Sequence, residues 1–184
     1  AHQTCMALGI ATSQACSLIG QSGTITHFME LGMTIRNGIE SALLAQVGVT
    51  SMTNVIENPQ GFCHTFCGPD GYDLTNVCKD MGKSYLVLTP EVFVKKYPCC
   101  FQNHKALDAL LSLIRENNIT YDQVESVETG VNDFDKSFLH YADPTCALET
   151  MFCLHHGLAA AILKGRLDWQ FWSDECAVAP EFKE

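Results

Sequence analysis

Long hydrophobic runs are missing from this sequence of 184 residues. No segment approaches the roughly 18 consecutive apolar residues of a membrane-spanning helix, and no basic segment followed by an apolar one begins the chain. Basic residues are also scarce, since 11 Lys and Arg stand against 21 Asp and Glu, for a formal net charge of −10. A chain this acidic has no general affinity for nucleic acid or anionic membranes. We therefore expect a soluble, cytoplasmic protein with no nucleic-acid and no membrane partner.

Charged residues of either sign make up only 17% of the chain, and the sequence contains neither an internal repeat nor a low-complexity tract. These absences exclude a repeat protein and an intrinsically disordered chain. Hydrophobic residues make up 47%, and the length allows one core or two small domains. The composition is therefore typical of an ordinary globular protein.

Cysteine is the residue type in clear excess, with ten in the chain. We expect the thiols to be reduced, because the sequence lacks the features of a secreted disulfide framework. The segment from Cys63 to Cys67, followed by Cys78, has some character of a zinc site. The second pair of ligands that such sites usually have is missing. We therefore expect no metal, and a zinc-binding module remains an alternative.

The hydrophobic spacing predicts a helical first part and a mixed second part. Helical spacing is found over residues 4–19, 28–47, 50–57, 103–117 and 147–163. Residues 85–90 and part of 121–131 have the pattern of strands. The predicted fold class is therefore α+β. The predicted domains are a helical portion (1–67), a linker (68–84) that begins with Gly68-Pro69-Asp70-Gly71, and an α/β lid (85–184).

Residues 95–104, which we call the Lys95 turn, concentrate reactive and basic side chains: Lys95-Lys96-Tyr97-Pro98-Cys99-Cys100-Phe101-Gln102-Asn103-His104. Pro98 favours an irregular segment, and a helix should begin near Asn103 or His104. Backbone N–H groups at a helix start, with two lysines nearby, attract carboxylates or phosphates. A basic turn without function on the protein surface is the alternative.

With these segments in order, the sequence resembles the MmgE/PrpD family over nearly its whole length. The resemblance rests on segments whose order and spacing match: Gly32-Met33-Thr34-Ile35-Arg36-Asn37-Gly38, Gly61-Phe62, Lys96-Tyr97-Pro98-Cys99-Cys100, His104, Asp108-Ala109, Pro144-Thr145 and Phe152-Cys153-Leu154. It implies a helical domain with a smaller α/β lid, no cofactor, and a small di- or tricarboxylate as substrate. The implied reaction is a lyase reaction, dehydration or decarboxylation of a 2-methylcitrate- or cis-aconitate-type substrate. Isomerisation or epimerisation of a dicarboxylate is the alternative.

The resemblance also implies roles for individual residues. Lys95 keeps the lysine of a family Lys-x-Tyr-Pro turn and would bind carboxylate, with Cys100 and His104 as further substrate-binding residues. A family lysine falls at His27 and a family tyrosine at His156, which would handle the proton as catalytic residues because imidazole titrates near neutral pH. Alternatively, His27 is a surface residue at a helix start and His156 a packed core residue.

Family members are about two to three times longer than this chain, which therefore resembles a central fragment. The uncharged helix around residues 7–15 needs neighbours on several sides, so we expect a homo-oligomer, such as a homodimer, or a companion chain. A non-catalytic association module, using a helical face within residues 4–47, remains a further alternative.

Overall fold

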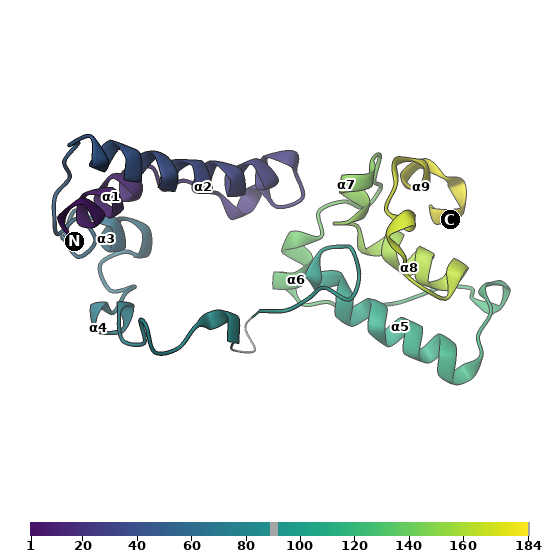
Figure 1. Cartoon of the computed structure of the whole chain (residues 1–184). Coiled ribbons are helices and arrows are strands. Elements are labelled where there is room, and N and C mark those ends of the chain that lie inside the picture. The colour runs from purple at the N-terminus through teal and green to yellow at the C-terminus, as the bar shows by residue number, and fades with distance from the viewer. Residues whose placement is uncertain (89–91, 184) are drawn as a thin grey trace. The chain divides into compact units, whose positions relative to one another are not determined.

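The computed structural model describes residues 1–88 and 92–183 as two compact units (Figure 1). Unit 1 comprises Ala1–Ile19 and Thr26–Phe93, and unit 2 comprises Gly20–Ile25 and Val94–Glu184. Each unit is described separately below. No helix in the described part of the chain is both long and apolar enough to cross a membrane. The domain limits predicted from the sequence stay a prediction.

Unit 1 is helical, as predicted. Its helices are α1 (His2–Ser13), most of α2 (Ile25–Gln46), α3 (Phe62–Cys67) and α4 (Leu74–Val77), with a 3-10 turn at Leu86–Leu88. Helix α2 is the one predicted over residues 28–47, and Gly48 follows it with a φ of 96°, a value that favours glycine. The helix predicted over residues 4–19 is partly wrong, because α1 ends at Ser13. The helix predicted over residues 50–57 is wrong, because these residues form turns.

Local hydrogen bonds explain both differences. The Leu18 N–H donates to Glu30 Oε1 at 3.1 Å, outside any α-helix, and α1 has already ended at Ser13. The carbonyls of Val55 and Ile56 accept hydrogen bonds from the N–H groups of Phe62 and Cys63, at 2.8 and 3.1 Å. Residues 50–57 therefore form turns that support the start of α3 instead of a helix of their own.

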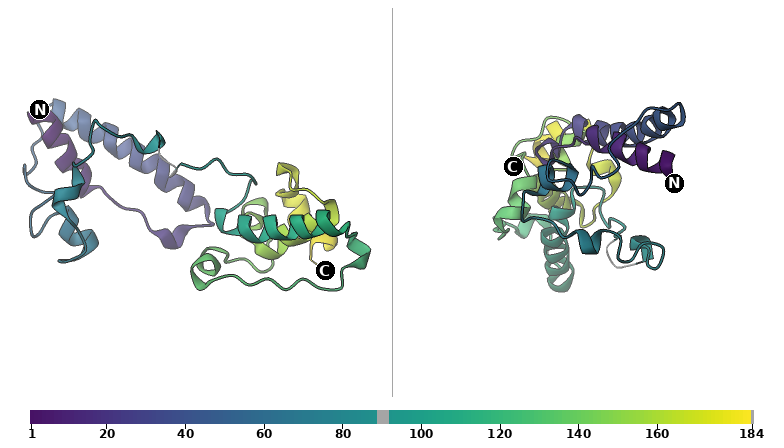
Figure 2. Two further views of the ribbon diagram at one scale, coloured as in Figure 1. Left: turned by 90° about the horizontal axis from the view of Figure 1, so that it is seen from below. Right: turned by 90° about the vertical axis from the view of Figure 1, so that its left-hand side faces the viewer.

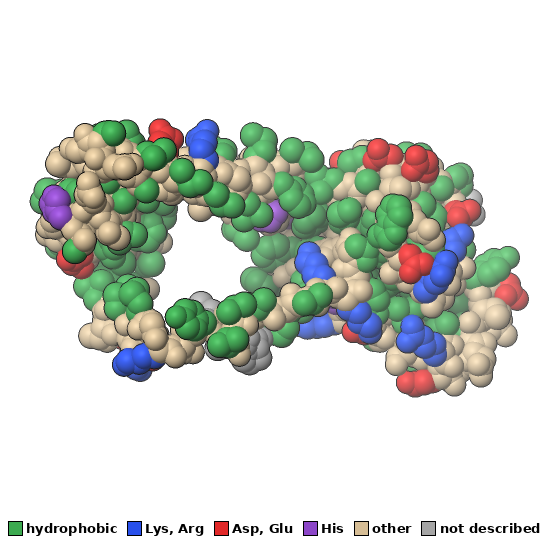
Figure 3. Space-filling model, viewed as in Figure 1, with side chains coloured by type: hydrophobic (Ala, Val, Ile, Leu, Met, Phe, Trp, Pro, Cys, Tyr) green, Lys and Arg blue, Asp and Glu red, His purple; other side chains and the backbone are tan. Residues whose placement is uncertain are grey.

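Helix α1 packs against the loop that follows α2. The Met6 sulfur accepts a hydrogen bond from the Ser51 N–H at 3.2 Å, and a Cβ on Gly9 would lie only 2.0 Å from Ser51 Oγ. Gly9 is therefore needed for this close approach. In contrast, many side chains along α2 are hydrophobic and exposed, among them Ile35 and Ile39 (Figure 3).

Unit 2 is also helical, and its helices surround one core. They are α5 (His104–Asn117), α6 (Asp133–Phe138), α7 (Ala147–Thr150), α8 (Leu154–Lys164) and α9 (Asp174–Val178). Short 3-10 turns occur at Ile19–Gln21, Phe101–Asn103, Tyr121–Gln123, Trp169–Phe171 and Pro180–Phe182. Helices α5 and α8 share the most extensive contact in the unit (Figure 2).

The core forms where α5 crosses α8. Leu107 of α5 is 0% exposed, and a Cβ on Gly157 of α8 would lie 3.1 Å from Leu107 Cδ2. Leu111, Ala160 and Ala161 are buried in the same cluster. The small residues of α8 therefore let the two helices approach closely.

The helix predicted over 147–163 is interrupted between α7 and α8. Cys153 has an extended backbone, and its sulfur accepts a hydrogen bond from the His156 N–H at 3.3 Å as the N-cap of α8. The predicted end of this helix is confirmed, because Gly165 follows α8 with a φ of 64°.

The predicted α+β class and α/β lid are wrong, because residues 1–88 and 92–183 contain no strand. Leu86–Leu88 is a 3-10 turn, while Thr89 and Pro90 lie outside the described residues. Thr120 and Gln123 close a capping box around Tyr121–Gln123. The strand pattern predicted for part of residues 121–131 is not sustained, because Val124, Val127 and Val131 lie three and four positions apart and not two.

Candidate functional site

A hollow of about 650 Å³ lies in unit 2 beside the Lys95 turn. Its lining comes from two segments, Lys95–Pro98 and Arg166–Gln170: Lys95, Lys96, Tyr97, Pro98, Arg166, Leu167, Asp168, Trp169 and Gln170. We call it the Lys95 hollow. Its size falls in the range of small-molecule sites, roughly 300–1,000 Å³.

The Lys95 turn is held in place by the connection between α7 and α8. The Cys100 N–H donates to the Met151 carbonyl at 2.8 Å, and the Asn103 side-chain amide donates to the same oxygen at 3.2 Å. Helix α5 then begins at His104, as the sequence predicted. The opposite wall begins directly after Gly165, where α8 ends.

Lys96 forms an ion pair with Asp108 of α5, and Tyr97 Oη donates to the same carboxylate at 2.6 Å. These two hydrogen bonds lower the pKa of Asp108, while burial and the bond to Asp108 raise the pKa of Tyr97. Asp108 of α5 is therefore tied to both Lys96 and Tyr97 of the Lys95 turn. Lys96 and Asp108 lie twelve positions apart in the sequence, so hydrophobic periodicity does not predict that they form a pair.

Lys95 differs from its neighbour because no ion pair joins it to a carboxylate within the described ranges 1–88 and 92–183. Its side chain is exposed in the wall of the hollow. Its positive charge contributes to lowering the pKa of His104. An anion can therefore approach Lys95 without displacing an existing carboxylate.

His104 is 6% exposed, and its ring packs on Tyr97 and Phe101 with centroid distances of 5.1 and 5.0 Å. Its buried Nε2 has no hydrogen-bond partner among the residues the structure describes. Burial is the main cause that lowers its pKa. His104 is consequently a neutral imidazole at pH 7, with one ring nitrogen available for a hydrogen bond.

Cys99 and Cys100 are buried thiols within the same turn. Burial raises the pKa of Cys99 to about 12 and also raises the pKa of Cys100, whose sulfur donates to Gln102 Oε1 at 3.0 Å. Both remain protonated at neutral pH, which disfavours a nucleophilic role. The predicted substrate contact of Cys100 stays a prediction.

His156 lies in the core of unit 2 and is 2% exposed. Its Nε2 lies 2.7 Å from the Phe171 carbonyl, and its ring stacks on Phe182 at a centroid distance of 4.9 Å. Burial lowers its pKa. This environment matches the core-residue alternative, whereas the proposed role in proton transfer stays a prediction.

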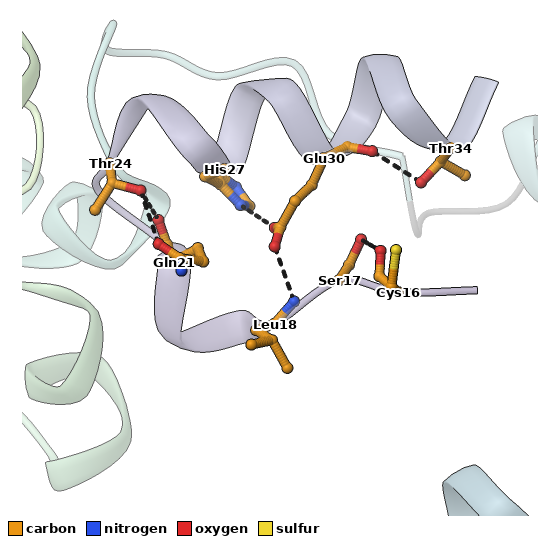
Figure 4. Close-up of polar contacts among 8 residues, drawn as sticks. All are labelled: Cys16, Ser17, Leu18, Gln21, Thr24, His27, Glu30 and Thr34. Carbon is orange, nitrogen blue, oxygen red and sulfur yellow. Dashed lines mark hydrogen bonds and ion pairs between the residues drawn. The ribbon is translucent and has the colours of Figure 1, made fainter. Parts of the chain in front are cut away.

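His27 belongs to unit 1, in the first turns of α2 (Figure 4). Its Nδ1 lies 4.0 Å from Glu30 Oε2, and the other oxygen of Glu30 accepts the Leu18 N–H. The structure therefore brings Lys95, Cys100 and His104 together in one turn, while His27 lies in the other unit. Its predicted catalytic role stays a prediction.

Sequence reasoning missed the second wall of the hollow. Arg166 Nε lies 3.0 Å from Asp168 Oδ2, and the Trp169 side chain is 79% exposed. An arginine, an aspartate and a tryptophan directly after the helix-ending Gly165 were a signal, since charged and aromatic residues in a loop often contact ligands.

The thiols do not assemble a metal site in the part of the chain that the structure describes. All ten cysteines are free. No three His, Cys, Asp or Glu side chains within residues 1–88 and 92–183 are placed to hold a metal ion. The alternative that Cys63, Cys67 and Cys78 bind zinc therefore receives no support.

Comparison with known proteins connects both units to one family. The family model described as the MmgE/PrpD N-terminal domain matches residues 1–75, and that of the MmgE/PrpD C-terminal domain matches residues 97–184. Cis-aconitate decarboxylase of Aspergillus terreus is 33% identical over 113 residues, 58% of this chain. A second sequence of that enzyme, from a named strain of Aspergillus terreus, is 33% identical over 115 residues, 59% of this chain. The chain spans 23% of the length of these two curated relatives. Because the two family models together cover most of its residues, this chain belongs to the MmgE/PrpD family.

Proposed function

We propose that this chain is part of a lyase that acts on a small di- or tricarboxylate, by decarboxylation or dehydration, and that the Lys95 hollow binds a carboxylate of the substrate. The observation that carries the proposal is the exposed Lys95 in the wall of the hollow, which has no ion pair in the described residues. The name of the similar enzyme, cis-aconitate decarboxylase, supports a tricarboxylate substrate.

The chemistry of this reaction class explains why such a lysine is useful. Loss of CO₂ or of a proton next to a carboxylate builds negative charge on the substrate, which a fixed cation stabilises. Lys95 supplies that cation. His104 is not among the residues that line the hollow and its Nε2 is buried, so its predicted contact with the substrate stays a prediction.

Isothermal titration calorimetry with citrate tests the proposal on wild-type protein, Lys95→Met and the control Lys79→Met, which removes an exposed lysine of unit 1. We expect Lys95→Met to weaken binding roughly tenfold, near the lower end for a charge-assisted hydrogen bond because the side chain is exposed. Lys79→Met should bind citrate like the wild type. Equal affinity of the Lys95→Met and wild-type proteins, or no citrate binding to either, would contradict the proposal.

A further inference from the structure

We infer that Arg166 is a second carboxylate-binding residue of the Lys95 hollow and that Trp169 covers the carbon chain between two acid groups, so that the site selects ligands with two separated carboxylates. This inference rests on the function proposed for Lys95. It assigns the specificity of the site to the wall that follows α8.

The two walls carry the positive charge of the hollow. Three lining side chains are basic and one is acidic, in a chain with a formal net charge of −10. Lys96 is already balanced by Asp108, which comes from α5 and does not line the hollow. The basic groups that remain for a ligand are therefore Lys95 on one wall and Arg166 on the other.

Arg166 is bound by Asp168 in a way that leaves most of its donors available. The ion pair joins Nε to Asp168 Oδ2 at 3.0 Å, and both side chains are substantially exposed. A guanidinium has five N–H donors, so this contact leaves the terminal amino groups for another acceptor. Asp168 also limits the rotation of the guanidinium plane. The arrangement suits two parallel hydrogen bonds to a carboxylate, which the single ammonium of a lysine does not form.

Trp169 supplies an exposed apolar surface to the hollow that Lys95 and Arg166 also line. Its side chain is 79% exposed although it lines the hollow, whereas the nearby Trp172 is 4% exposed and belongs to the core. An indole exposed in a hollow provides a broad apolar face with one N–H donor. Such a face stabilises the methylene or alkene carbons of a ligand whose two ends bind cations.

Size agrees with this division of roles. The hollow of about 650 Å³ has room for more than a single carboxylate group, because small-molecule sites of roughly 300–1,000 Å³ hold whole drug-sized ligands. A monocarboxylate would use one cation and leave the other solvated. A ligand with two separated acid groups uses both, and the gain from the second contact sets the selectivity.

The test compares acetate, succinate and citrate as probes on wild-type protein, Arg166→Gln and the control Arg115→Gln, which removes an exposed arginine of α5. We expect Arg166→Gln to weaken the binding of succinate and of citrate about tenfold, which is the effect of losing one exposed charge-assisted contact. The affinity for acetate should stay within twofold of the wild-type value. Arg115→Gln should leave all three affinities unchanged. The double variant Arg166→Gln/Asp168→Asn keeps the net charge of the wall and should show the same loss as Arg166→Gln.

Trp169 provides a second readout in the unmodified protein. Because Trp172 is buried, acrylamide quenching of tryptophan fluorescence reports mainly on Trp169. Saturating citrate should lower the quenching constant at least twofold, since the ligand covers the indole. Arg166→Lys keeps the charge without the planar fork and serves as the variant least expected to disturb folding. The preference of Arg166→Lys for succinate and citrate over acetate should lie between that of the wild type and that of Arg166→Gln.

The outcomes separate this inference from the proposed function. If Lys95→Met weakens citrate but Arg166→Gln does not, or weakens acetate equally, the role of Arg166 is refuted while that of Lys95 stands. Unchanged quenching with citrate bound refutes the role of Trp169. If neither Lys95→Met nor Arg166→Gln changes citrate binding, both proposals fail.

Discussion

The contact between Leu107 and Gly157 offers a direct test of how the two walls of the Lys95 hollow are held. Leu107 lies in α5, which directly follows the Lys95 turn, and Gly157 lies in α8, which directly precedes the wall that begins at Arg166. A Cβ added to Gly157 would meet Leu107 Cδ2 at 3.1 Å and Cδ1 at 3.5 Å. Leu107 is 0% exposed, so little space remains into which it could move.

Two opposing effects decide whether Gly157→Ala raises or lowers the free energy of unfolding. Replacing a glycine inside a helix by alanine gains about 1 kcal/mol of helix propensity, whereas overpacking a tight core costs about 1–3 kcal/mol. We expect crowding to prevail and the free energy of unfolding to fall by about 1 kcal/mol. Leu107→Ala alone should cost about 2–5 kcal/mol as a cavity-forming change. With Leu107 already replaced by alanine, the Cβ added by Gly157→Ala no longer meets the Leu107 Cδ atoms, and the change should stabilise by about 1 kcal/mol.

Urea denaturation followed by tryptophan fluorescence measures the four proteins of this cycle, because Trp169 and Trp172 both lie in unit 2. The expected coupling energy is about 2 kcal/mol, well above the 0.3–0.5 kcal/mol typical of independent sites. Gly38→Ala, in an exposed part of α2 where an added Cβ meets nothing within 4 Å, should leave this transition unchanged. Additive effects in the cycle, or a stabilising Gly157→Ala in the wild-type background, would refute the close packing described here.

Two further predictions concern unit 2. Burial lowers the pKa of His104 and His156 in the folded chain, so the unfolded chain takes up protons first as the pH falls through about 6.5. The free energy of unfolding should therefore fall as the pH is lowered from 7 to 5, and a urea midpoint that rises as the pH is lowered would contradict the neutral state of these rings. Asn118 ends α5 with φ 52° and ψ 41°; Asn118→Gly should be neutral or stabilising, whereas Asn118→Val should cost about 1–2 kcal/mol. Scanning calorimetry compares the two variants, and equal stability would contradict the left-handed backbone.

Several parts of this structure could be predicted from local sequence signals. The helical spacing of α2, the start of α5 at His104 and the end of α8 at Gly165 follow from periodicity, from the restriction at Pro98 and from the conformational freedom of glycine. The Lys95 turn could be identified because its side chains adjoin in the sequence. Each of these features depends on residues within a few positions of one another.

The remaining features depend on contacts that the hydrophobic pattern does not show. Residues 121–131 have a strand pattern only in part, since Val124, Val127 and Val131 do not keep the two-residue period, and the sequence does not show whether another strand lies beside them. The break at Cys153 depends on its sulfur capping α8, which the uninterrupted helical pattern conceals. The wall formed by Arg166 and Trp169 adjoins Lys95 only because α5 packs on α8. Sequence reasoning therefore failed where caps, turn hydrogen bonds and packing between helices decide the structure, because hydrophobic periodicity does not encode them.

The pattern of ion pairs is consistent with the anion site proposed above, although the chain as a whole is acidic. Most lysines of unit 2 that line or border the packed helices have a carboxylate partner, as in the pairs Lys96–Asp108, Lys105–Asp135 and Lys164–Glu181. Paired exposed charges contribute little to stability and attract a further anion weakly. Lys95 lines the hollow and has no carboxylate partner within residues 1–88 and 92–183. Arg166 keeps N–H donors that its contact with Asp168 does not use. Which cations remain available, more than how many there are, therefore determines where a carboxylate can bind.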